Sequence, residues 1–321
     1  MRFVVFGAGG VGGVVGARLA QHGFDVALVA RGKHYEALRD NGLRLETPDD
    51  SVKLELPVFD HPAGVQWTAE DVVLLAMKSQ DTLAALEALS AVASSNLPVI
   101  CLQNGVANER IALRRFAHVY GVYVWCAAGH LTPGVVQAWC SPTTGILDIG
   151  RYPSGVDELA ETLAVAFRSA TFLSEVRADV MRWKYRKLLS NLGNAVEALC
   201  GSAARGSVLL IEARREGTAC LQAADISFAA DEENGAAREK QLQVRPIGNN
   251  KRPGGSSWQS LARRAHTIET DYLNGEIALL GRTHGIPTPV NEALQRLMRK
   301  AARDRAAPGS LTLEQIQEEI N

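Results

Sequence analysis

A glycine-rich turn near the N-terminus constrains this chain more than any other feature. A short apolar strand over Phe3–Phe6 leads into Gly7-Ala8-Gly9-Gly10-Val11-Gly12, which has the pattern G-x-G-x-x-G, and a helical stretch follows over Val14–His22. Between a strand and a helix, this pattern is typical of a dinucleotide site. The first glycine permits a tight turn, the second lets a pyrophosphate approach the backbone, and the third lets helix and strand pack closely. The N-terminus of the helix then offers N–H groups and a positive dipole end to the phosphates. The alternative is an ordinary turn between strand and helix.

The residue that follows the second apolar run of the chain is the one that we expect to distinguish NADP(H) from NAD(H). That run spans Val26–Ala30 and is followed by Arg31. An NAD site usually has Asp or Glu about 20 residues past the turn, whereas an Arg nearby accommodates a 2′-phosphate. A carboxylate would repel the phosphate, and a guanidinium donates two hydrogen bonds to it. Arg31 therefore favours NADP(H) as the cofactor. A solvated loop charge is the other interpretation.

Composition excludes several classes of protein. The chain has 321 residues, of which 46% are hydrophobic and 21% charged, as expected of a folded protein with two domains. A net charge of -1 provides no basic field for nucleic acid, and no apolar stretch is long enough to span a bilayer. The five cysteines form no C-x-x-C pair, and no basic leader precedes the first strand, so we expect reduced thiols in a cytoplasmic protein. The seven histidines have no metal-ligand spacing, and His22, His34 and His61 are interpreted as solvated surface residues.

Strands and helices alternate in the first half of the chain. This alternation predicts an α/β fold with a doubly wound, largely parallel sheet of the Rossmann type. The expected strands are Phe3–Phe6, Val26–Ala30, Asp71–Met77, Val99–Leu102, Val122–Trp125, Ile146–Ile149 and Ala170–Val176, with helices such as Gln80–Ser94 and Asn108–Phe116 between them. We expect an NADP-binding Rossmann domain over residues 1–176.

Strand signals become scarce beyond residue 176, and a C-terminal all-α domain is predicted over 177–321. Its expected helices are Ala178–Leu199, Gly206–Phe228, Ser260–His284 and Asn291–Arg305. The polar stretch Asp231–Ser256 is predicted to be a mobile loop, serving either as a lid or as a plain surface connection. The basic run Arg296–Arg305 is interpreted as a solvated helix face.

Polar residues follow two of the expected strands. Lys78 comes after the strand ending at Met77, and Gln103-Asn104-Gly105 comes after the strand ending at Leu102. Ligands bind outside the carboxyl ends of strands in such sheets, so both segments could reach a cofactor. Ordinary loop chemistry is the alternative, because Asn-Gly is a common turn pair.

The C-terminal half holds two further clusters. Lys187 and Asn191 are one helical turn apart among leucines, and a lysine facing an apolar cleft would release its proton more easily. The second cluster combines Ser256-Ser257-Trp258 with Glu269, a carboxylate that could hold the Lys187 ammonium. For both Lys187 and Glu269, a surface charge is the alternative.

These pieces, in this order, resemble the ketopantoate reductase (2-dehydropantoate 2-reductase) family nearly end to end. The matching segments are Gly7–Gly12, Arg31, Lys78, Gln103-Asn104-Gly105, Pro133-Gly134-Val135, Lys187-Leu188-x-x-Asn191, Ser256-Ser257, Glu269, Asp271–Gly275 and Gly285–Asn291. The resemblance implies a Rossmann domain followed by a helical domain, with the active site in the cleft between them. It also implies NADPH as cofactor, pantoate as product and a homodimer through the helical domain.

The resemblance assigns roles position by position. Gly7, Ala8, Gly9, Gly10, Val11 and Gly12 would hold the pyrophosphate and Arg31 the 2′-phosphate. Lys78, Asn104 and Ala128 would line the cofactor site near the nicotinamide. Lys187 would be the general acid, and Asn191, Asn194 and Ser257 would bind the 2-oxo acid substrate. Glu269 would meet the cofactor ribose and help fix the catalytic site.

Several residues depart from the family pattern, and all lie on the substrate side. Asn191 and Asn194 are three apart where the family usually has four, and Trp258, Leu261 and Ile268 stand where it usually has Met, Asp and Thr. A further substrate-contacting Asn of the family has no match near Ala204 or Arg205. Two alternatives to a ketopantoate reductase therefore stay open: an NADPH-dependent reductase of a bulkier 2-oxo acid, and a non-catalytic NADPH-binding regulator.

Overall fold

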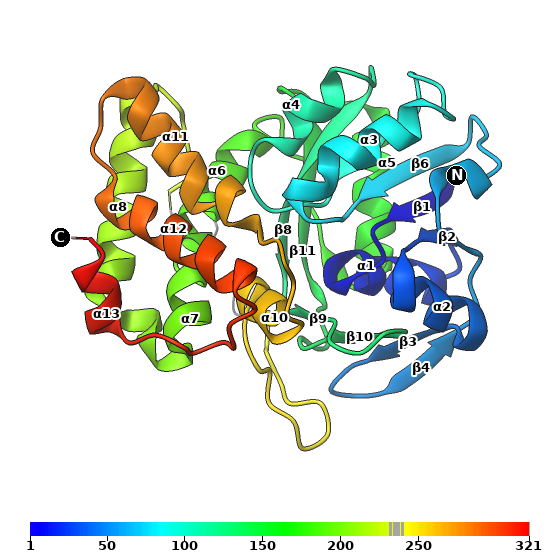
Figure 1. Ribbon diagram of the computed structural model, residues 1–321. Helices are drawn as coiled ribbons and strands as arrows, with labels where there is room; N and C mark the ends of the chain where they lie inside the picture. The colour runs from blue at the N-terminus through cyan, green and yellow to red at the C-terminus, as the bar shows by residue number, and fades with distance from the viewer. Residues whose placement is uncertain (231–232, 234–237, 239–240, 321) are drawn as a thin grey trace. The chain divides into compact units, whose positions relative to one another are not determined.

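The chain folds into two compact units, shown as a ribbon in Figure 1. The computed structural model describes residues 1–230, 233, 238 and 241–320. The first unit comprises Met1–Lys184 and Asp231–Arg252, and the second comprises Tyr185–Ala230 and Pro253–Asn321. The change of unit falls inside helix α6 (Val180–Asn191). The sequence predicted a single boundary after residue 176. In the structure, residues 177–184 and 231–252 also belong to the first unit.

The first unit is built around an eight-stranded sheet with the order β12-β11-β8-β7-β6-β1-β2-β5. The strands are β1 (Arg2–Phe6), β2 (Asp25–Val29), β5 (Val58–Phe59), β6 (Asp71–Leu75), β7 (Val99–Cys101), β8 (Val119–Cys126), β11 (Gly145–Arg151) and β12 (Phe172–Leu173). Neighbouring strands are parallel except β8 and β11, which are antiparallel. The predicted doubly wound, largely parallel sheet is confirmed.

Both faces of this sheet are buried, which explains the continuous apolar runs in its strands. Successive side chains of β1 alternate between two cores: Phe3 and Val5 belong to one, and Val4 belongs to the other. Helices α1 (Gly10–Gln21) and α5 (Glu158–Ser169) contribute to the first core. Helices α3 (Thr82–Ser90) and α4 (Asn108–Leu113) contribute to the second. Different helices therefore cover the two faces of the sheet (Figure 1).

A second, four-stranded sheet in this unit is absent from the sequence-based expectation. Its order is β4-β3-β10-β9. Its strands are β3 (Leu43–Glu46), β4 (Ser51–Leu54), β9 (Ala128–Gly129) and β10 (Val135–Ala138). The strands are short and mix polar with apolar residues, and β10 pairs with β3 across a long stretch of chain, as in Val135 opposite Arg44. No local pattern signals such a pairing.

The second unit is helical, as predicted for the C-terminal part of the chain. Beyond the end of α6, its helices are α7 (Asn194–Cys200), α8 (Val208–Ala223), α10 (Ser256–Ala262), α11 (Asn274–His284), α12 (Pro289–Arg303) and α13 (Leu313–Glu318). Short 3-10 helices span Ser202–Gly206 and Glu269–Tyr272. Among the described residues of the whole chain, no helix is both long and apolar enough to cross a membrane.

Two of the predicted helices are wrong as continuous elements. The helix expected over Ala178–Leu199 breaks between α6 and α7, at Gly193. A Cβ on Gly193 would lie 2.6 Å from Leu210 Cδ1, so α8 packs directly against the break. The helix expected over Ser260–His284 is divided into α10, a 3-10 turn and α11. Arg264, with φ 54°, turns the backbone into the left-handed region directly after α10.

Part of the predicted mobile loop packs on the first unit. Val244 forms an antiparallel bridge with Cys140, and the Arg245 N–H donates to Trp139 O (2.8 Å). The Arg245 guanidinium also pairs with Asp49 at 2.7 Å. Between residues 231 and 240, the structure describes only residues 233 and 238. The lid role that the sequence predicted for this loop therefore falls outside the described residues. All five cysteines are free thiols.

Gly150 gives a test of the packing along β11. A Cβ there would collide with Arg177 O, because the backbone of residues 175–177 runs beside the strand and the Arg177 N–H donates to Ile149 O (2.8 Å). We predict that Gly150→Ala lowers the free energy of unfolding by about 1–3 kcal/mol, as overpacking does. Gly206→Ala is the control, because a Cβ on Gly206 meets nothing within 4 Å. Equal denaturant midpoints for the two variants would contradict this packing.

Candidate functional site

The glycine-rich turn is held at the carboxyl ends of β1, β2 and β6. Gly7 has φ +101°, a conformation that L side chains rarely adopt, and its N–H donates to Val29 O (3.0 Å). A Cβ on Gly7 would lie 2.6 Å from Met77 N. The tight turn expected at this glycine is thus required both by the backbone angle and by the neighbouring strand end.

The remaining glycines divide into two kinds. A Cβ on Gly12 would collide with Gly7 O and come within 2.7 Å of Ala76 Cβ, so this glycine lets α1 pack on the sheet. A Cβ on Gly9 would meet nothing closer than His130 Cδ2 at 3.9 Å, so the space beside Gly9 is open. Gly9 is also the N-cap of α1, with no side-chain cap and no acidic residue in the first turn. The backbone N–H groups of that turn therefore suit an anionic pyrophosphate.

Arg31 lies at the start of the next helix, α2 (Gly32–Asn41), of which it is the N-cap residue. Its side chain is 79% exposed, and its guanidinium contacts Asp81 at 2.9 Å. An exposed pair of this kind contributes little to stability, so Arg31 can exchange its partner for another anion at small cost.

His34 and His130 join the turn from two distant segments and correct one interpretation made from the sequence. His34 is half-buried rather than solvated, and its Nε2 lies 2.7 Å from Ala8 O. The Gly134 N–H donates to His34 Nδ1 (3.0 Å), so Nε2 carries the proton that is donated to Ala8. The two imidazole rings are 4.2 Å apart. No sequence signal marks these contacts, since His34 and Gly134 are 100 residues apart.

Ala128 and the two predicted polar segments also lie in this part of the first unit. A Cβ on Gly10 would be 3.6 Å from Ala128 Cβ, so the predicted Ala128 lies beside the turn. Lys78 lies three residues beyond the end of β6, and Asn104 lies three residues beyond the end of β7, the adjacent parallel strand. The Asn108 side chain joins the two segments by donating to Asn104 O (3.0 Å) and to Ser79 Oγ (3.1 Å).

A buried ion pair distinguishes two lysines on α6. The Lys184 ammonium lies 2.6 Å from Glu109 Oε1, with the two side chains 2% and 0% exposed. It also donates to Gln103 O (2.7 Å) and, less closely, to Val122 O (3.4 Å). An ammonium has three protons to donate, so these three acceptors occupy it. Lys187, one turn further along α6, is half-buried.

The predicted substrate residues belong to neighbouring elements of the second unit. Asn191 is the last residue of α6, and Asn194 is the first of α7. The Gly255 N–H, at the N-cap of α10, donates to Glu197 Oε1 (3.1 Å), and a Cβ on Gly255 would be 3.8 Å from Asn194 Oδ1. Ser257, in the first turn of α10, is therefore close in the fold to the start of α7.

Two buried asparagines, to which the sequence assigned no role, hold the turn between Asn191 and Asn194. Asn274 Nδ2 donates to Leu192 O within that turn (3.2 Å) and to Asn291 Oδ1 (3.0 Å). The Asn291 amide in turn donates to Glu216 Oε2 (2.7 Å). Glu269 is the first residue of the 3-10 helix that precedes α11, and it is buried, with 4% of its surface exposed.

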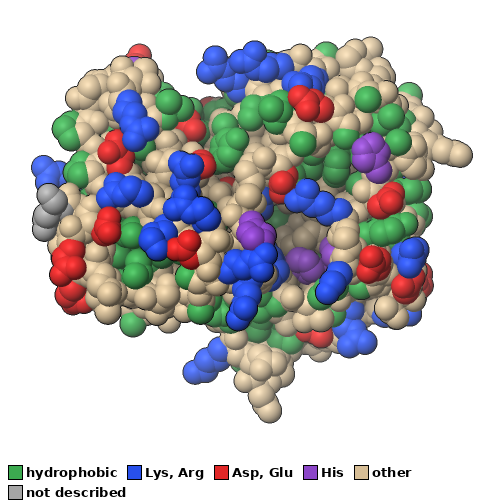
Figure 2. Space-filling view, in the orientation of Figure 1, with side chains coloured by type: hydrophobic (Ala, Val, Ile, Leu, Met, Phe, Trp, Pro, Cys, Tyr) green, Lys and Arg blue, Asp and Glu red, His purple; other side chains and the backbone are tan. Residues whose placement is uncertain are grey.

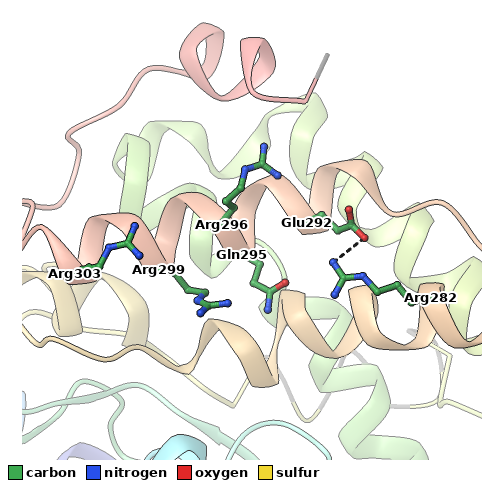
Figure 3. Close-up of a pocket in the computed structure, with 6 residues that line it drawn as sticks. All are labelled: Arg282, Glu292, Gln295, Arg296, Arg299 and Arg303. Atoms are coloured by element: carbon green, nitrogen blue, oxygen red, sulfur yellow. Dashed lines mark hydrogen bonds and ion pairs between the residues drawn. The ribbon is translucent and has the colours of Figure 1, made fainter.

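A separate cavity of about 290 Å³ lies on α11 and α12 (Figure 3). It is lined by Arg282, Glu292, Gln295, Arg296, Arg299 and Arg303, with Arg282 and Glu292 paired at 3.2 Å. Basic side chains gather over α12 in the space-filling view (Figure 2). None of the predicted site residues lines this cavity. Arg296, Arg299 and Arg303 are exposed on α12, as predicted for the basic run, and Arg282 comes from α11. The described residues contain no group of three or more His, Cys, Asp or Glu arranged to bind a metal ion.

Comparison with known proteins matches both parts of the chain to one family. The profile described as "Ketopantoate reductase PanE/ApbA" matches residues 3–153, and its C-terminal counterpart matches residues 179–302. The chain belongs to the ketopantoate reductase family. It is accordingly an oxidoreductase that acts on a CH–OH group.

Relatives and solved structures extend this match over nearly the whole length. A 2-dehydropantoate 2-reductase from Halobacterium salinarum is 32% identical over 317 residues, which cover 95% of this chain and 100% of the relative. A PanE/ApbA family ketopantoate reductase from Ralstonia eutropha JMP134 has a TM-score of 0.78 at 29% identity, covering 95% of this chain and 99% of that one. D-mandelate dehydrogenase, solved with NADH and anilino(oxo)acetate, has a TM-score of 0.79 with the same coverage. At 21% identity, its likeness concerns the fold alone.

The two kinds of glycine in the turn give a matched pair of variants. We predict that Gly12→Ala destabilises the reductase by about 1–3 kcal/mol, because the new methyl group meets a backbone oxygen that cannot move aside. Gly9→Ala should change the free energy of unfolding by less than about 1 kcal/mol, because its methyl group enters open space. Denaturant unfolding measures both values, and a larger loss for Gly9→Ala would contradict the assignment of the two glycines.

Proposed function

We propose that this enzyme reduces 2-dehydropantoate (ketopantoate) to pantoate with NADPH, a step that supplies pantothenate and coenzyme A synthesis. The observation that carries the proposal is the full-length similarity to proteins named 2-dehydropantoate 2-reductase, which reaches 32% identity. The cofactor half of the proposal is supported independently by the geometry of the glycine-rich turn.

The residues present fit a phosphorylated dinucleotide. The open space beside Gly9 and the uncapped first turn of α1 suit the pyrophosphate. Arg31 would receive the 2′-phosphate in exchange for its exposed contact with Asp81, and no carboxylate occupies its position. Lys78, Asn104 and Ala128 would line the nicotinamide half. When bound, NADPH supplies the hydride that is added to the C2 ketone.

Lys187 is proposed as the general acid. Negative charge develops on the ketone oxygen as the carbon is reduced, and an ammonium near that oxygen stabilises the charge and donates the proton. Lys184, its neighbour on the same helix, cannot serve, because its three donors are engaged within the fold. Glu269 would orient the ammonium and the ribose, and Asn191, Asn194 and Ser257 would hold the substrate carboxylate and hydroxyl by hydrogen bonds.

A bulkier 2-oxo acid is the second candidate substrate. Trp258 replaces the Met usual in the family, and it follows Ser257 directly on α10. Its ring folds over the preceding loop, where a Cβ on Gly254 would come within 2.6 Å of Trp258 Cδ2. A large aromatic side chain at this position changes the shape of whatever pocket Ser257 lines.

A panel of 2-oxo acids, followed through NADPH absorbance, tests the proposed reaction. We expect ketopantoate to have the highest kcat/KM. Preference for another acid by about tenfold, which corresponds to about 1.4 kcal/mol of transition-state binding, would favour the second candidate. Tight NADPH binding without turnover of any acid would refute both and favour a regulator.

The assignment of Arg31 predicts a change in cofactor preference. Arg31→Ala should weaken NADPH binding by about tenfold to a hundredfold, the loss expected for a charged hydrogen bond, and should leave NADH binding nearly unchanged. Arg39→Ala is the control, because Arg39 is an exposed arginine of the same helix that pairs with Asp40. Dissociation constants come from cofactor fluorescence. An equal loss for both cofactors would refute the 2′-phosphate role.

The assignment of Lys187 predicts a loss of turnover without a loss of cofactor. Lys187→Ala should lower kcat by about 10²–10⁴-fold, the usual contribution of general-acid catalysis, while the Kd of NADPH stays unchanged. Lys300→Ala is the matched control, since Lys300 is an exposed lysine paired with Asp304. A change in kcat no larger than that of the control would exclude Lys187 as the proton donor.

A further inference from the structure

A continuous set of buried polar contacts lies behind the two segments that follow β6 and β7. It begins at the Lys184 ammonium, which contacts Glu109 Oε1 (2.6 Å) and donates to Gln103 O (2.7 Å). In the described part of the chain, the Glu109 oxygens receive no hydrogen bond from any group other than the Lys184 ammonium, so this ammonium alone balances the charge of the buried carboxylate. The ion pair therefore fixes the backbone at Gln103, the residue immediately before Asn104.

The contacts continue through the side chains of Gln103, Thr82 and Asn108, and the donor and acceptor of each hydrogen bond can be assigned. Gln103 Nε2 donates to Met77 O (3.0 Å) and to Thr82 Oγ1 (2.7 Å), and the single hydroxyl proton of Thr82 goes to Asn108 Oδ1 (2.8 Å). Since Thr82 gives its proton to Asn108, it can only accept from Gln103. The amide of Gln103 is therefore not flipped.

Asn108 completes the connection. Its Nδ2 donates to Ser79 Oγ (3.1 Å) and to Asn104 O (3.0 Å). Gln103, Thr82, Asn108, Ser79, Lys184 and Glu109 are all at least 97% buried. Burying so many polar groups is favourable only when they bond one another, so a single broken contact leaves partners unsatisfied.

These contacts hold the chain on both sides of Lys78, and they hold the backbone at Asn104 and at the residue before it. Lys78 lies between Met77, whose carbonyl accepts from Gln103, and Ser79, whose hydroxyl accepts from Asn108. Asn104 is held through its own carbonyl and through that of Gln103. The pyrophosphate turn meets the same segment, because a Cβ on Gly7 would lie 2.6 Å from Met77 N. Arg31, in contrast, takes no part in these contacts.

We propose that Lys184 and Glu109, with Gln103, Thr82 and Asn108, are positioning residues that hold Lys78 and Asn104 against the nicotinamide half of the cofactor. This inference rests on the proposed function, because it takes the roles of Lys78 and Asn104 from it. The consequence is selective: loss of these contacts weakens recognition of the nicotinamide half more than that of the adenosine half. Gly7 and Arg31 have other contacts of their own, from the Gly7 N–H to Val29 O (3.0 Å) and from Arg31 to Asp81 (2.9 Å).

The double variant Lys184→Met/Glu109→Leu tests this directly. Replacing a buried ion pair with apolar residues of similar size is often neutral for stability, but the Gln103 and Val122 carbonyls also lose their donor, so the free energy of unfolding should fall by no more than about 1–3 kcal/mol. We expect its Kd for NADPH to rise about tenfold or more, the effect of losing one well-placed hydrogen bond, with unchanged affinity for 2′,5′-ADP. The second probe carries the 2′-phosphate and lacks the nicotinamide.

Thr82 supplies a second pair of variants. Thr82→Val keeps the shape and removes the hydroxyl that joins Gln103 to Asn108, whereas Thr82→Ser keeps the hydroxyl. Thr82→Val should reproduce the selective loss of NADPH affinity, and Thr82→Ser should retain wild-type affinity. This pair decides the question if the double variant fails to fold.

The outcomes separate this inference from the proposed function. Wild-type protein that binds neither NADPH nor 2′,5′-ADP would refute the proposed function, and this inference with it. Wild-type protein that binds both, with variants that keep full NADPH affinity, would refute this inference alone. Variants that lose both probes equally would also refute it, because the contacts would then support the fold in general rather than one half of the site.

Discussion

The close approach of α1 to the sheet is the constraint on which the site depends. Gly12 leaves no room for a side chain between α1 and the turn, and it brings the helix against Val5 of β1 and Ala76 after β6. This contact aims the N-terminus of α1 at the space beside Gly9, where no side chain intrudes. A side chain in place of Gly12 would push the helix away from the sheet, and its first-turn N–H groups would no longer point into the space beside Gly9. A packing requirement of the core thus produces the helix orientation that we propose for binding the pyrophosphate.

Buried charges in the first unit join segments that are far apart in sequence. Lys184 and Glu109 tie the start of α6 to the segment after β7. Asp148 on β11, with its side chain 0% exposed, accepts two hydrogen bonds from Arg238 (2.7 and 2.8 Å), which ties the segment preceding α10 to the same unit. Such pairs add little net stability compared with apolar packing, but they fix one arrangement, because a displaced partner leaves a buried charge without compensation.

The sequence predicted what local patterns encode. All the strands expected in the large sheet are present, because strands buried on both faces read as apolar runs, and the glycine-rich turn has the conformation that its spacing implied. The four-stranded sheet was missed because its strands are short and pair over long distances. Lys184 and His34 were missed for the same reason, since their partners Gln103 and Gly134 lie 81 and 100 residues away. The helix breaks at Gly193 and Arg264 depend on tertiary packing and on one backbone angle, which residue patterns in a helix do not reveal. The roles of all the predicted site residues stay predictions. On the cofactor side these are Gly7–Gly12, Arg31, Lys78, Asn104 and Ala128, and on the catalytic and substrate side they are Lys187, Asn191, Asn194, Ser257 and Glu269.

The fold of the ketopantoate reductase family positions the proposed site, and we expect individual side chains of this chain to determine whether it binds NADP(H) or NAD(H). The most direct measurement is a crystal structure of the protein grown with NADP⁺. We expect the pyrophosphate to accept hydrogen bonds from the first-turn N–H groups of α1 beside Gly9, with the 2′-phosphate against the Arg31 guanidinium. A dinucleotide whose pyrophosphate lies away from this turn, or whose 2′-phosphate points into solvent while Arg31 stays with Asp81, would contradict it.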